Sequence, residues 1–78
     1  MTASPTPAEM QHLIAQVIAG VAGGTERVWR TKIGPVTALP IVLHPRSNWS
    51  VSPMCGTADY RIINQATEVV RAEHPYVR

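Results

Sequence analysis

The chain has 78 residues, of which 45% are hydrophobic and 15% are charged, and its formal net charge is +2. A chain of this length forms a small domain that buries only about 60% of the surface its unfolded form exposes. Intrinsic disorder combines low hydrophobicity with high net charge, and this composition has neither. We therefore expect one folded domain over residues 1–78, with an ordered core at about 5–75 and flexible ends.

The composition also bears on the compartment. The single cysteine, Cys55, excludes an internal disulfide and fits a reducing environment. The first residues lack the basic and then apolar regions of a secretory signal. The longest apolar stretch, within residues 13–22, is far shorter than the ~20 residues of a membrane span. The sequence therefore predicts a cytoplasmic protein without a membrane segment.

Residues 7–22 predict an amphipathic helix. Thr6 and Glu9 have the spacing of a capping box, and Pro7 takes the first helical position, where no N–H is needed. Two glycines after residue 22 favour the end of the helix. The apolar residues recur with a helical period, at Met10, Leu13, Ile14, Val17, Ile18 and Val21.

The first of three predicted strands covers residues 26–33. The alternation of its side chains places Trp29, Thr31 and Ile33 on one face. Val28, Arg30 and Lys32 then share the opposite face. The Gly-Pro pair that follows predicts a turn into the next strand.

The second strand is predicted over residues 36–43 and the third over residues 48–52. Both faces of the second strand are mostly apolar. Pro40 cannot donate a hydrogen bond to a neighbouring strand, so this strand lies at the edge of the sheet or is bulged there. In the third strand, Trp49 and Val51 point to the same side.

A second amphipathic helix is predicted over residues 58–73. Thr57 is its expected N-cap, and Asp59 supplies a negative charge in the first turn. Pro75 marks its end, because the residue before a proline avoids helical angles. The expected apolar stripe consists of Ile62, Ile63, Ala66, Val69 and Val70.

These elements predict the α+β class, with a small antiparallel sheet of about three strands packed by two helices in the order α-β-β-β-α. With both helices on one face, the covered side chains are Trp29, Ile33, Leu39, Ile41, Leu43 and Trp49. In the alternative, the helices lie on opposite faces and bury both. Double-stranded-RNA-binding domains share this element order, but their lysine-rich start of the second helix is replaced here by residues 57–61, with one acid and one arginine.

With both helices on one face, the other face of the sheet remains apolar and uncovered. A contiguous apolar patch with a charged rim marks an interaction surface, and association stabilises small domains. The sequence therefore predicts a non-catalytic interaction module that forms a homodimer or docks on a protein partner. The predicted contact residues are Val28, Arg30, Lys32, Val36, Ala38 and Val42.

Two other functions remain open at this point. A nucleic-acid-binding protein would contact phosphates through Arg27, Arg30, Lys32 and Arg46, because no acidic residue lies between Arg27 and Ala58. A thiol enzyme would use Cys55, near the start of the second helix. The scattered histidines and single cysteine lack the paired spacing of a metal site, and no motif implies a cofactor or a small-molecule substrate.

Overall fold

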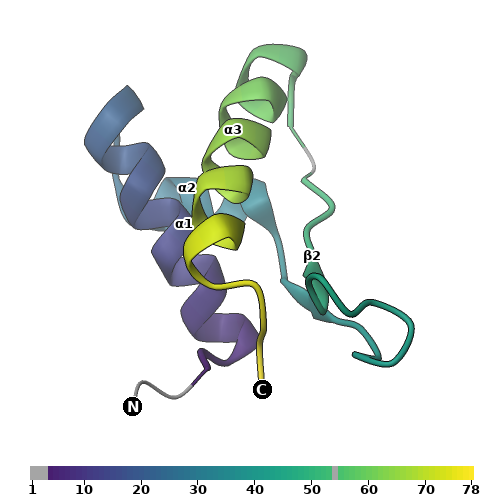
Figure 1. Cartoon of the computed structure of the whole chain (residues 1–78). Helices are drawn as coiled ribbons and strands as arrows, with labels where there is room; N and C mark the ends of the chain where they lie inside the picture. Colours follow the sequence, from purple (N-terminus) through teal and green to yellow (C-terminus); the bar gives the residue numbers. More distant parts are fainter. Residues whose placement is uncertain (1–3, 54) are drawn as a thin grey trace.

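The computed structural model describes residues 4–53 and 55–78, which form three helices and a two-stranded antiparallel sheet. Figure 1 shows α1 beside α3, with α2 behind them and the short sheet to one side. α1 packs against both of the other helices. The elements are α1 at Pro7–Ala22, α2 at Glu26–Ile33, β1 at Thr37–Ala38, β2 at Trp49–Ser50 and α3 at Thr57–Glu73.

The first helix, α1, begins as the sequence predicts. The Thr6 hydroxyl accepts a hydrogen bond from the Glu9 N–H at 3.2 Å, and the Thr6 N–H donates to Glu9 Oε1 at 3.3 Å. The helix ends at Gly23, whose φ of 82° suits glycine. The side chains that it buries are Met10, Ile14, Ala15 and Ile18.

The prediction of a strand over residues 26–33 is wrong, because this segment is the helix α2. The Thr25 hydroxyl accepts from the Val28 N–H and caps it, and Gly34, with a φ of 73°, ends it. Trp29 and Ile33 are buried, as the alternating pattern predicts. Residues four apart also share one face of a helix, so this pair fits both structures.

The sheet is much smaller than the sequence predicts. Only Thr37 and Ala38 of the second predicted strand pair with Ser50 and Trp49. The Leu39 N–H adds one more bond, to the Asn48 carbonyl at 2.7 Å. Beyond this point the chain turns, since Pro40 has no N–H with which to extend the ladder. The chain is therefore a mixed α and β structure, but the three-stranded sheet and the α-β-β-β-α order are not found in the part that the structure describes.

The last helix, α3, is the second amphipathic segment of the sequence. Its N-cap is Gly56, not Thr57 as predicted, and no side-chain bond caps it. It ends at His74, directly before Pro75. The side chains that it buries are Ile63, Ala66, Thr67 and Val70. None of the described helices is both long and apolar enough to cross a membrane.

The residues after α3 return to the start of the chain. The Asn48 side chain donates to the Val77 carbonyl at 3.0 Å and accepts from the Val77 N–H at 2.7 Å. The Arg78 N–H donates to the Pro5 carbonyl at 3.0 Å. Val77 is buried in the core with Trp49. Residues 77 and 78 thus contact the middle and the first described residues of the chain. Of the predicted flexible residues 1–4, residues 1–3 lie outside the described part.

Candidate interaction surfaces

The six predicted partner-binding residues do not form one surface. Val28 and Arg30 are exposed on α2, whereas Lys32 is half-buried near its end. Val36 was expected on the free face of a sheet, but it is only 7% exposed and belongs to the core. Ala38 and Val42 are exposed. The predicted face is lost because α2 is a helix and β1 is only two residues long.

The loop after β1 carries the most exposed group of aliphatic side chains near the sheet. Ile41, Val42 and Leu43 are 52%, 87% and 73% exposed. The sequence assigned Ile41 and Leu43 to the covered face, and that prediction is wrong. A turn produces the exposure, since the N–H groups of Leu43 and His44 both donate to the Pro40 carbonyl at 3.1 Å. We call residues 40–43 the aliphatic loop.

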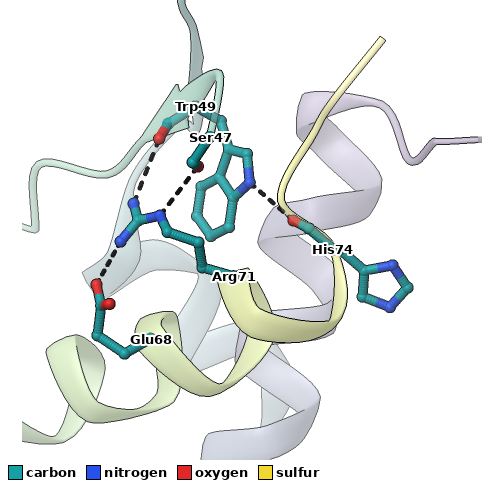
Figure 2. A network of polar contacts seen from close by, with 5 residues as sticks. All are labelled: Ser47, Trp49, Glu68, Arg71 and His74. Carbon is teal, nitrogen blue, oxygen red and sulfur yellow. Dashed lines mark hydrogen bonds and ion pairs between the residues drawn. The ribbon is translucent and has the colours of Figure 1, made fainter. Parts of the chain in front are cut away.

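The base of this loop is held by α3 and the tail, as Figure 2 shows. Arg71 donates from Nε to the Ser47 hydroxyl at 3.0 Å and from the guanidinium to the Trp49 carbonyl at 3.3 Å. Its guanidinium lies 4.6 Å from the centre of the Trp49 ring and also pairs with Glu68. The Trp49 N–H donates to the His74 carbonyl at 3.0 Å. Ser47 and Trp49, which follow the aliphatic loop in the sequence, are thus hydrogen-bonded to α3 and to His74.

A second apolar surface lies between α1 and α3. A groove of about 430 Å³ separates the end of α1 from the middle of α3. Val21 and Val69 were both predicted in buried stripes, but they are 84% and 54% exposed at this groove. We call this surface the α1–α3 groove, and it is lined by Val17, Ile18, Val21, Ala22, Ile62, Gln65, Ala66 and Val69.

The residues of the nucleic-acid alternative fall into different environments. Lys32 Nζ lies 2.8 Å from Asp59 Oδ2 and 4.8 Å from the centre of the Trp29 ring. Trp29 is buried and its N–H donates to the Gly23 carbonyl at 2.8 Å, so its ring is unavailable for stacking on a base. Arg46 is exposed in the loop that leads to β2.

The other two predicted cations, Arg27 and Arg30, line one wall of a cleft of about 550 Å³. They lie three residues apart on α2 and therefore point to the same side. Pro7 and Ala8 in the first turn of α1 and residues 34–36 after α2 also line this cleft. Gln11 joins the two helices, since its side-chain nitrogen donates to the carbonyls of Arg30 and Gly34 at 3.2 and 2.5 Å.

Most carboxylates of the described residues lie close to a basic side chain. Glu9, Glu26, Asp59 and Glu68 each lie within 4 Å of a cation or a histidine. Hydrogen bonds from the backbone and hydroxyl of Thr6, with a further one from Arg78, hold the pKa of Glu9 below its ordinary value. Four arginines have no ion-pair or hydrogen-bond partner for their side chains among the described residues: Arg27, Arg30, Arg46 and Arg61.

Cys55 is a free cysteine in the structure. This residue is half-buried, packs at the edge of the core and precedes the N-cap of α3. No group of three or more potential metal ligands occurs within residues 4–53 and 55–78. The thiol-enzyme alternative therefore stays a prediction.

Comparison with known proteins does not assign a family. No family model, no curated protein and no solved structure matches this chain.

Proposed function

We propose that the chain is a non-catalytic protein-interaction module that docks through the aliphatic loop. We further propose that the partner is a second copy of the chain. The observation that carries this proposal is the exposure of Ile41, Val42 and Leu43. Burial of one such side chain contributes about 1.5–3 kcal/mol. Because these three aliphatic side chains are exposed, the domain lacks several kcal/mol of burial free energy that they could contribute. This amount is large beside a total free energy of unfolding of about 5–15 kcal/mol. A partner that covers the loop recovers that free energy.

A second copy of the chain is a suitable partner because the α1–α3 groove is an apolar surface on which the aliphatic loop can pack. In Figure 1 the loop between β1 and β2 extends at the lower right, whereas the end of α1 that borders the α1–α3 groove lies at the upper left. A chain therefore leaves its own groove open to the loop of another molecule. Such a head-to-tail contact joins two different surfaces and extends into rings or filaments.

Two charge variants test this proposal, one in each surface. Val42→Asp places a carboxylate on the aliphatic loop, and Val69→Asp places one on the α1–α3 groove. We expect the mass of the wild-type chain, measured by light scattering, to rise with concentration, and each variant to remain monomeric. An equimolar mixture of the two variants should form dimers, because one intact loop and one intact groove remain. Val28→Asp, on an exposed site of α2 outside both surfaces, is the matched control and should behave as the wild type.

The outcomes separate the two kinds of partner. A wild-type chain that stays monomeric from micromolar to millimolar concentration would contradict self-association and leave a different protein as the partner of the loop. Dimers of each variant alone, without mixing, would show that neither surface is the contact. In either case the circular dichroism spectra of the variants should match that of the wild type, because Val42 and Val69 lie outside the core.

A further inference from the structure

We propose that the cleft between α2 and the first turn of α1 binds an acidic peptide segment, with Arg27 and Arg30 holding its carboxylates. The two arginines and Thr31 supply the polar wall of this cleft. Pro7, Ala8 and Pro35 supply aliphatic surface on the other sides. The cleft shares no residue with the aliphatic loop or the α1–α3 groove, so this proposal stands apart from self-association.

The charge of the cleft favours an anionic ligand. None of the residues that line the cleft is acidic. The nearest carboxylate in the sequence of α1, that of Glu9, borders a neighbouring hollow and is already bonded to Thr6 and Arg78. Arg30 also lines that neighbouring hollow, but neither Arg27 nor Arg30 forms an ion pair with any described residue. The cleft therefore presents two cations without an ion-pair partner in the described part of the chain.

The geometry of the guanidinium group favours carboxylates as the anions. Arginine presents a planar fork of N–H donors that matches a carboxylate with two parallel hydrogen bonds. Arg27 and Arg30 are separated by about one turn of α2, so they can engage two carboxylates of one extended segment. The aliphatic walls then contact the apolar side chains between those carboxylates.

The lining and the open shape of the cleft favour a peptide over other anions. A single-stranded nucleic acid needs a continuous basic track and aromatic rings on which bases stack. The cleft has two cations and no aromatic side chain among its lining residues, and the nearby Trp29 is buried. A small carboxylic acid buries most of its surface in an enclosed pocket, whereas this cleft is open to solvent. A peptide gains further contact area by extending beyond the cleft.

The experiment uses a fluorescently labelled peptide of four Glu-Val repeats and the full chain, with binding followed by fluorescence anisotropy at low salt. Arg27→Gln/Arg30→Gln removes both cations of the cleft. Arg46→Gln/Arg61→Gln removes two exposed and unpaired cations from elsewhere and is the matched control. We expect the cleft variant to bind at least about tenfold more weakly, since bonds between charged groups are lost. The control variant should bind within about twofold of the wild type, because only long-range attraction changes.

Each other outcome overturns the proposal. Equal weakening in both double variants would mean that net charge alone attracts the peptide. Tighter binding of an oligonucleotide than of the peptide, lost in the same cleft variant, would assign the cleft to nucleic acid. Succinate that displaces the peptide at equal concentration would assign it to a small acid. Equal binding of a peptide of Gln-Val repeats, or no binding of the Glu-Val peptide at low salt, would remove the role of the carboxylates.

Discussion

Two apolar residues between β1 and α3, Trp49 in β2 and Val42 in the aliphatic loop, have opposite environments. Trp49 is 1% exposed, with its N–H bonded to His74 and its ring covered by Arg71, whereas Val42 is 87% exposed. Both are large apolar residues near the same small sheet. Hydrophobicity alone therefore does not decide which of these side chains is buried. Trp49 is buried because α3 and the tail bond to it, and the aliphatic loop lies where no helix reaches.

The largest test of this comparison is Trp49→Ala against Val42→Ala. Removal of a buried tryptophan side chain costs about 3–5 kcal/mol, which is most of the stability of a small domain. Removal of the exposed Val42 side chain should change the free energy of unfolding by less than about 0.5 kcal/mol. Urea denaturation followed by circular dichroism measures both. Similar losses of the free energy of unfolding in the two variants would contradict the difference in burial between Trp49 and Val42.

Arg71→Ala tests how firmly α3 holds the base of the loop. The change removes hydrogen bonds to Ser47 and Trp49 and the contact with the Trp49 ring. Net values of about 0.5–1.5 kcal/mol per bond predict a loss of about 2 kcal/mol in the free energy of unfolding. Arg61→Ala, an exposed site on the same helix, is the control and should cost less than about 0.5 kcal/mol. An equal effect of the two changes would show that the network in Figure 2 does not stabilise the fold.

Thr67→Val tests the cost of burying a hydroxyl group in the core. Thr67 is buried on α3, and its hydroxyl has no hydrogen-bond partner in the described part of the chain. Valine has nearly the same shape without the hydroxyl, so the cost of burying that polar group disappears. We expect the free energy of unfolding to rise by about 1 kcal/mol, measured by urea denaturation. Thr31→Val, at an exposed position on α2, should give no such gain, and a loss of stability in Thr67→Val would refute the interpretation.

The smallest expected effect concerns pH and the capping box of α1. The pKa of Glu9 is lowered in the folded chain, so its contribution is complete above the unfolded pKa and is lost as the pH falls through the folded pKa. Glutamine also forms this box but does not titrate, so Glu9→Gln should flatten that part of the stability profile. Thermal melts from about pH 6 to about pH 3 compare the two proteins. Parallel profiles would show that the Glu9 bonds are too weak to matter.

The long helices could be read from the sequence, whereas the short elements could not. α1 and α3 repeat an apolar stripe over several turns, and α1 also carries the Thr6–Glu9 capping box. α2 has only eight residues, and its two core side chains fit a strand as well as a helix. Periodicity decides between the two only over longer windows. The sequence pattern therefore could not predict the secondary structure of the segment that joins the two long helices.

The candidate surfaces were predicted only in part. Val42 was expected to be exposed, and it is, but Val36 is buried and Ile41 is exposed, contrary to expectation. Pro40 was recognised as unable to extend a ladder, and a turn at that residue would have placed its neighbours in solvent. The α1–α3 groove could not be predicted, because the crossing of two helices depends on side-chain packing and not on the stripe of either helix alone.

The clamp of Asn48 on Val77, and the bond from Arg78 to Pro5, have a consequence for the order in which the molecule can assemble. They join residues 77 and 78 to Asn48 and to Pro5, which are far from them in the sequence. α1 and α2 are neighbours in the sequence and can pair across a short connection, whereas the surroundings of Trp49 are complete only when the His74 carbonyl and Val77 reach it. Contacts between residues so distant in the sequence slow the folding of a small domain, so we expect closure around Trp49 to follow the pairing of α1 and α2.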